Sequence, residues 1–330
     1  MRSDAFVNLR RKRQPILLIP AVLVIAIAFA VTSRGSDTRY HMLPALPSDA
    51  AASSLLLDAA TDGQRILVAG EQGHILYSDD SGTTWTHAQV PVSLAITSVT
   101  FSGSVNAWAT AHDGLLLRST DRGQSWQTNL TGVDVARMTA DAAEAKVKQL
   151  RAELDLAAPG DLEDLEWALE DAQFAYDDAS ENIDFGVTVP LLDVWFENDR
   201  RGFALGAYGI LLHTTDGGTT WSLLSGRLDN PDNYHLYGIA QSVSGTLLVA
   251  GEAGILMRSR DDGENWDRLD SPYQGSFFGV VAADDGGLLT FGLRGNVFRS
   301  TDDGDTWSAV VTGDQRTLLS GMTQANGGIV

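Results

Sequence analysis

A unit of twenty residues occurs five times in this chain, and no residue is inserted or deleted inside any copy. Each copy consists of an apolar stretch, a turn that closes in glycine, a second apolar stretch and the pattern Ser/Thr-x-Asp-x-Gly-x-(Ser/Thr/Asn)-Trp. The copies begin at Ile66, Ala107, Gly202, Leu247 and Leu288. Apolar stretches separated by such turns predict paired antiparallel strands, so we expect a repeating β-meander.

The turn that closes each copy explains its own composition. Its aspartate accepts hydrogen bonds from backbone N–H groups, its glycine adopts a positive φ, and its tryptophan packs against the meander. We therefore expect structural roles for these residues, which are Asp80, Asp121, Asp216, Asp261 and Asp302 with Trp85, Trp126, Trp221, Trp266 and Trp307.

The tryptophans that close successive copies are 41, 95, 45 and 41 residues apart, so an insertion interrupts an otherwise regular repeat. A further β-rich stretch precedes the later copies, as at Ile96–Phe101 and Phe277–Ala282, which gives four strands per repeat. Four strands at this period predict an all-β propeller. A solenoid is the less favoured alternative, because these strands are apolar on both faces. We expect five full blades plus a partial one here, six or seven when intact, with residues 40–57 as a candidate closing strand.

The terminal pattern resembles the Asp-box, or BNR, repeat of sialidases, sortilin-type receptors and the photosystem II stability/assembly factor family. The run from Val68 to Trp85 (V-A-G-x-x-G-x-I-L-x-S-x-D-x-G-x-T-W) is most similar to the last of these. The resemblance covers residues 55–135 and 187–330. It implies an extracytoplasmic, non-enzymatic propeller that handles an integral membrane protein during assembly. The implied complex is photosystem II, or a transporter complex in a host without photosynthesis.

The N-terminus predicts export. A basic cluster at residues 10–13 precedes an uncharged apolar run from Pro15 to Val31. Such a run is just long enough to span a bilayer with the rest of the chain on the periplasmic side. We expect a transmembrane anchor, and a cleaved signal peptide is the alternative because Ala28-Phe29-Ala30 fits a cleavage site.

Between the second and third copies the apolar period changes from two to about 3.6 residues, which predicts a helical hairpin. The second helix contains many carboxylates and no lysine or arginine, and it also contains Trp167 and Phe174. A solvated helix face is one interpretation, and an acidic docking arm is the other.

Propeller topology puts this arm on the same face as the turns between second and third strands, and we expect a partner-binding surface there. Its candidate residues are Glu71, His112, Asp113, Tyr208, Glu252, Arg294, Trp167 and Phe174. Arg118, Arg258 and Arg299 share one repeat position nearer the other face. They either pack between blades or form a basic patch for an acidic partner.

Other chemistry finds little support. The chain has no cysteine, and its six histidines do not form a zinc motif. We expect no catalytic residue, metal or small-molecule cofactor. The formal charge of −20 disfavours nucleic acid as a partner. The alternative function is a sialidase-like or other glycoside hydrolase, or a glycan-binding propeller, although no Phe/Tyr-Arg-Ile-Pro motif is present.

The expected organisation is a basic N-terminus with its membrane segment (1–33), a linker (34–54), blades one and two (55–132), the acidic hairpin (133–186) and the remaining blades (187–330).

Overall fold

The computed structural model describes residues 43–185, 188–283 and 285–323, all of which belong to one compact unit formed by residues 39–330. In this part of the chain there are five antiparallel sheets of four strands, and within each sheet every strand pairs with the next one along the chain. The repeats are therefore meanders.

The bounds of the strands follow the sequence repeat. Sheet one contains β1 (Leu56–Thr61), β2 (Ile66–Gly70), β3 (Ile75–Ser78) and β4 (Thr86–His87). Sheet two contains β5 (Ile96–Ser102), β6 (Asn106–Ala111), β7 (Leu115–Ser119) and β8 (Gln127–Leu130). Sheet three contains β9 (Leu191–Phe196), β10 (Gly202–Gly206), β11 (Leu211–Thr214) and β12 (Ser222–Leu223). Sheet four contains β13 (Leu236–Gln241), β14 (Leu247–Gly251), β15 (Leu256–Ser259) and β16 (Asp267–Arg268). Sheet five contains β17 (Phe277–Ala282), β18 (Leu288–Gly292), β19 (Val297–Ser300) and β20 (Ser308–Val310).

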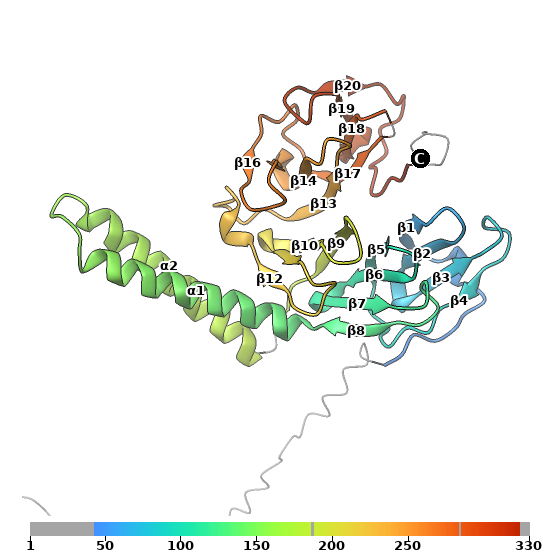
Figure 1. Cartoon of the computed structure of the whole chain (residues 1–330), viewed down its shortest axis with the longest axis horizontal. Helices are drawn as coiled ribbons and strands as arrows, with labels where there is room; N and C mark the ends of the chain where they lie inside the picture. The colour runs from blue at the N-terminus through green and yellow to red at the C-terminus, as the bar shows by residue number, and fades with distance from the viewer. Residues whose placement is uncertain (1–42, 186–187, 284, 324–330) are drawn as a thin grey trace, which may run out of the picture. The chain divides into compact units, whose positions relative to one another are not determined.

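The first strands of consecutive sheets are neighbours, and the first strands of all five sheets line one cavity. Figure 1 shows these first strands nearest the middle and the last strands on the outside. This is the arrangement of a β-propeller, and each sheet is one of its blades.

Residues 318–323 lie between the fifth blade and the first. The Leu318 N–H donates to Gly292 O at 3.1 Å, and the Thr323 hydroxyl donates to Ala282 O at 2.7 Å. On the other side, the Ser320 hydroxyl donates to Asp58 at 2.8 Å. The repeat spacing predicts the first strand of the partial sixth blade at these residues.

In blades two, three and four, the glycine of the Asp box also explains how neighbouring blades pack. Gly218 has φ +77°, and a Cβ placed on it would lie 2.1 Å from the ring of Trp108 in the preceding blade. Gly123 and Gly263 meet the matching second-strand residues of their preceding blades, Leu67 and Phe203. Only glycine meets both demands, a positive φ and no side chain. The repeat motif therefore serves blade-to-blade packing as well as the turn.

Residues 40–57 were the candidate closing strand, and the described part of this segment corrects that expectation. Residues 51–53 form a short 3-10 helix, and Ala51 is buried against Val68 and Leu76 of blade one. The Ala45 N–H donates to Val90 O at 3.0 Å. The segment thus covers the apolar face of sheet one that bears Val68 and Leu76. Only its last two residues belong to β1.

The insertion consists of α1 (Gly132–Leu154) and α2 (Leu162–Phe185). A capping box starts α1, because Thr131 and Asp134 each accept a hydrogen bond from the backbone N–H of the other. α1 contacts blades two and three and packs along α2, which makes an arm beside the sheets (Figure 1). The predicted membrane segment, residues 15–31, lies outside the described residues. Among those that are described, no helix is both long and apolar enough to cross a bilayer.

Candidate partner-binding surfaces

The second and third strands of every blade are joined by the same tight turn. Its two central residues both have positive φ, between +52° and +60° at the first position and between +69° and +78° at the second. Such a pair is typical of a type I′ hairpin turn. The second position is always glycine, whereas the first varies and is Gln72, Asp113, Tyr208, Ala253 or Arg294. Because these turns lie at equivalent positions, we call the side of the propeller that bears them the turn face.

The connections between blades lie on the turn face too. A Cβ on Gly73 would lie 2.1 Å from Val92 O in the connection between blades one and two. In blade two, Gly114 faces Gly132, the first residue of α1. The helical arm therefore leaves the propeller on the turn face, beside Asp113.

Some of the candidate residues on this face bond within their own blade, and others expose their side chains to solvent. The side chains of Glu71 and Glu252 accept the N–H groups of Leu55 and His235, each just ahead of a first strand, at 3.1 Å. These two glutamates therefore hold their own blades together. His112 and Arg294 are exposed, and Tyr208 is 60% exposed.

An aromatic run that the sequence did not predict leads from Tyr208 toward the axis. The ring of Tyr208 contacts His235 with 4.9 Å between centroids, His235 contacts Tyr237 at 6.1 Å, and Tyr237 contacts Phe278 at 5.0 Å. Tyr237 and Phe278 line the axial cavity. Burial and the nearby charge of Glu252 raise the pKa of Tyr237. This run extends the candidate surface from the rim of blade three to the mouth of the cavity.

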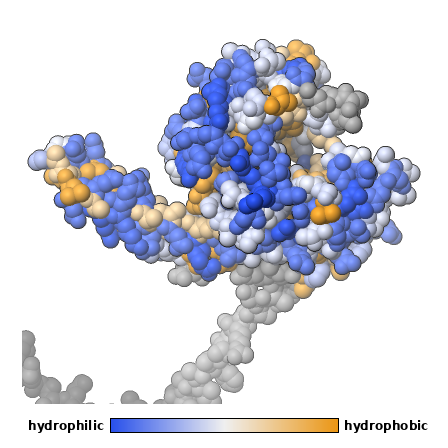
Figure 2. All heavy atoms as spheres, viewed as in Figure 1, coloured by the Kyte–Doolittle hydropathy of each residue, from blue (hydrophilic) through white to orange (hydrophobic). Residues whose placement is uncertain are grey.

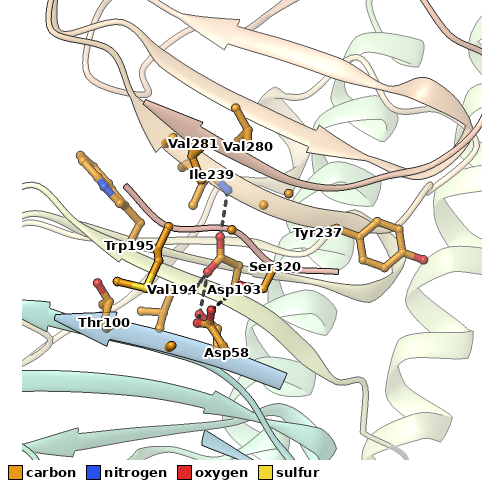
Figure 3. Close-up of a pocket in the computed structure, with 18 of the residues that line it drawn as sticks. Asp58, Thr100, Asp193, Val194, Trp195, Tyr237, Ile239, Val280, Val281 and Ser320 are labelled. Carbon is orange, nitrogen blue, oxygen red and sulfur yellow. Dashed lines mark hydrogen bonds between the residues drawn. The ribbon is translucent and has the colours of Figure 1, made fainter. Parts of the chain in front are cut away.

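The axial cavity has a volume of about 520 Å³, and two carboxyl groups from different blades meet in its wall (Figure 3). Asp58 of β1 accepts the Val99 N–H of the next blade at 2.9 Å, and Asp193 of β9 accepts the Ile239 N–H of its next blade at 2.9 Å. The hydroxyl of Ser98 lies 2.9 Å from an oxygen of Asp58 and 2.8 Å from an oxygen of Asp193. One serine thus joins two acids.

This arrangement favours one extra proton. A serine hydroxyl has a single hydrogen, so Ser98 can donate to only one of the carboxyl groups. The second contact is a hydrogen bond only when that acid is protonated. Burial, followed by the charge of Asp58, raises the pKa of Asp193 to about 6, and burial also raises the pKa of Asp58. In the part of the chain that the structure describes, the residues that line the cavity include no lysine, arginine or histidine to balance these charges.

A signal for this acid pair exists in the sequence. Asp58, Ser98 and Asp193 each occupy the third position of a first strand, as does Ser320 relative to the expected next strand. The twenty-residue unit begins at the second strand of each blade, so these positions lie outside it.

The arginines at the shared repeat position differ in their contacts, and Arg258 is the one that bonds to a neighbouring blade. The Arg258 side chain is 8% exposed and donates to Asp303 O at 2.9 Å and to Asp305 at 2.6 Å in the following blade. Arg299 pairs with Asp285 of its own blade, and the Arg118 guanidinium lies 5.2 Å from the Trp108 ring. Of the two interpretations, the contacts of Arg258 fit the one in which the arginine packs and bonds between blades.

The Asp boxes follow the third strands and so lie at the end of the blades away from the turn face. In blade three, Asp216 accepts the N–H and the hydroxyl of Thr220 at 2.9 and 2.7 Å. These hydrogen bonds, the backbone one first, lower the pKa of Asp216 to about 2. In each box the aspartate accepts a backbone N–H of its own turn, as the sequence predicts.

Residues 173–329, just under half of the chain, match a family model described as photosynthesis system II assembly factor YCF48. This chain resembles the photosystem II assembly factor family. A photosystem II assembly lipoprotein Ycf48 from Synechococcus sp. (strain CC9902) is 36% identical over 87 residues, which are 26% of each chain. The photosystem II stability/assembly factor HCF136, chloroplastic, from Arabidopsis thaliana is 40% identical over 90 residues, 26% of this chain and 22% of the relative. The matched segments thus span about a quarter of these relatives.

Two solved structures of the same family are similar to the chain. One is YCF48 bound to D1 peptide, with a TM-score of 0.48, 15% identity and coverage of 77% of this chain and 65% of that one. The other is YCF48 from Cyanidioschyzon merolae, with a TM-score of 0.43, 15% identity and coverage of 82% and 88%.

Proposed function

We propose that this protein is a non-catalytic accessory propeller that binds an integral membrane protein on the extracytoplasmic side and helps its complex to assemble. The observation on which the proposal rests is the match of residues 173–329 to the family model. Two curated relatives that are named as photosystem II assembly factors support it. The related structure with a bound D1 peptide is an example of a polypeptide ligand on such a propeller. We propose the same class of ligand here, a protein segment.

The turn face is the surface that we propose for this ligand. It bears residues that differ from blade to blade, among them His112, Tyr208 and Arg294, and the helical arm begins on this face beside Asp113. The Asp-box ends of the blades repeat one another and are occupied by their own hydrogen bonds, so they offer less to distinguish one partner from another.

Anchoring is part of the proposal. The apolar run from Pro15 to Val31 would hold the propeller at the membrane surface with its basic flank in the cytoplasm. A partner embedded in the same bilayer would then be met at high effective concentration, which favours even a weak contact.

The glycan-active alternative has one observation in its favour, since two carboxyl groups line a cavity as they do in glycoside hydrolases. However, both acids are bonded to backbone N–H groups of neighbouring blades, and among the described residues no arginine lines the cavity to bind an acidic sugar. These contacts favour a role in joining blades.

Two measurements test the proposal together. Affinity purification of the tagged full-length protein from membranes of its own host should enrich an integral membrane protein over an unrelated tagged propeller. A screen with fluorogenic glycosides, including sialosides, should give no turnover above that of the Asp58→Asn, Asp193→Asn variant. Turnover that this double variant abolishes would overturn the non-catalytic reading.

A further inference from the structure

One face of α2 packs against α1. Val147 and Leu150 of α1 and Ala179 of α2 are buried, and Arg151 donates to Gln173 across the pair at 2.8 Å. α1 alone of the two helices packs broadly against the blades. The opposite side of α2 is therefore free of cover in the described part of the chain.

Two large aromatic side chains lie on that uncovered side. Trp167 is 67% exposed and Phe174 is 73% exposed. They are seven residues apart, which is two turns of helix, so they lie on one stripe. Figure 2 shows the surface of the arm as hydrophilic patches interrupted by hydrophobic ones. Isolated apolar residues are common on surfaces, but two aromatics aligned on a helix that otherwise presents charge are a typical docking feature.

The same stripe is strongly acidic. Carboxylates flank both aromatics within the same third of the helix circumference, and all of them are exposed: Glu163, Asp164, Glu170, Asp171, Asp178 and Glu181. α2 contains no lysine or arginine, whereas four acidic and four basic residues balance along α1. Among the described residues, no ion pair joins the two helices, and Lys148 and Arg137 pair within α1. Within the described hairpin, the carboxylates of α2 are therefore not neutralised by ion pairs with α1.

We propose that this stripe of α2, with Trp167 and Phe174 at its centre, binds a cationic amphipathic helix of a partner protein. Apolar side chains of the partner would seat on the two rings, at the spacing by which helices commonly present anchors. Lysine or arginine beside them would meet the carboxylates and the faces of the rings. An anionic lipid surface does not fit, because the carboxylates repel it. The inference deepens the proposed function by giving the chemistry of one contact.

The test uses the full protein and a synthetic probe. The probe is a fluorescent amphipathic peptide with lysine and arginine flanking leucine and phenylalanine, and its counterpart has glutamate in place of each basic residue. We expect saturable binding of the basic peptide alone, weaker at higher salt. Trp167→Ala and Phe174→Ala should each weaken binding at least about tenfold. Circular dichroism checks that the helices of both variants remain folded.

The contribution of the carboxylates is tested with two triple variants that remove the same charge from different places. The triple variant Glu170→Gln, Asp171→Asn, Asp178→Asn should weaken binding and flatten its salt dependence. The control triple Asp232→Asn, Asp267→Asn, Asp270→Asn removes the same charge from exposed positions on blade four and its flanking connections, and Val243→Ala removes an apolar side chain that is 74% exposed. Neither control should change binding by more than about twofold.

Three outcomes would overturn the inference. They are equal losses in the stripe and control triples, unchanged binding in both aromatic variants, and preferential binding to vesicles of anionic or zwitterionic lipid. If the peptide fails to bind while the full protein still recovers a membrane protein from its host, the stripe is not the docking site and the proposed function stands. If both fail, the proposed function falls as well.

Discussion

Replacement of Asp193 by asparagine should make this propeller more stable at neutral pH. In the variant, the amide oxygen can accept the Ile239 N–H, and the amide N–H can donate to Ser98, whose hydroxyl is then free to donate to Asp58. Each of these hydrogen bonds has one donor and one acceptor, and the cavity wall loses one of its two negative charges. The native pair reaches the same pattern at Ser98 only by binding a proton. The variant has one cost, because the Val194 N–H donates at 2.8 Å to the Asp193 oxygen that faces Ser98 and loses this acceptor.

The magnitude follows from the raised pKa. The carboxyl of Asp193 has a pKa of about 6 in the folded protein against 3.8 as the ordinary value. Between these values the folded state binds more protons than the unfolded state, so native stability falls as pH rises from about 4 to about 6 and levels off above. The full shift corresponds to about 3 kcal/mol, and the Val194 N–H left without an acceptor costs part of it, so we expect a gain of about 1 to 2 kcal/mol for the variant above pH 6.

The assay is urea unfolding followed by tryptophan fluorescence, at about pH 4 and about pH 7.5. The variant should have the higher midpoint at the upper pH, and its advantage should vanish at the lower one. Asp232→Asn, an exposed acid outside the cavity, is the control and should show no such change. A difference of equal size at both pH values, or a variant that is less stable at pH 7.5, would refute the shared-proton reasoning.

Three further changes test other parts of the structure. Gly218→Ala should destabilise the protein by at least about 2 kcal/mol more than Gly82→Ala in thermal unfolding, because both have positive φ but only Gly218 packs against the preceding blade; equal effects would contradict this packing role. Arg258→Met should cost about 1 to 3 kcal/mol in urea unfolding, whereas Arg260→Met, at an exposed site with a longer contact to the same aspartate, should cost little; similar losses would argue against a specific inter-blade bond. Asp216→Asn should lower the unfolding temperature at pH 7, because the ionised carboxylate stabilises the turn. The pKa of Asp216 is lowered in the folded protein, so the difference from the native protein should shrink as pH falls below 3.8 toward 2. A difference that does not change with pH would contradict this role of the carboxylate.

The repeated part of the fold could be predicted from the sequence because each copy specifies its own structure locally. The apolar stretches, the glycine of each turn and the Asp box define a meander without reference to distant residues. The change of apolar period predicted the helical hairpin. Propeller topology predicted the face of the propeller on which the hairpin begins. Local patterns of this kind are consistent with one another, which makes them readable in a single sequence.

Contacts across blades were harder to predict. The pairing of Asp58 with Asp193 joins residues far apart in the chain, and the burial of Arg258 depends on the following blade. The cover that Ala51 gives to blade one replaces a strand that repeat arithmetic suggested. In each case the partner is set by how blades pack, and a sequence motif does not report that packing.

The repeat gives the propeller its shape, and our account assigns recognition to what interrupts the repeat. The most direct test compares the full-length protein with a variant that lacks residues 136–184, both purified by affinity from membranes of the host and analysed by quantitative mass spectrometry. The variant must first show the unfolding temperature of a folded propeller. We predict that the full-length protein recovers an integral membrane protein and that the folded variant largely loses it. Equal recovery by both proteins would contradict the account.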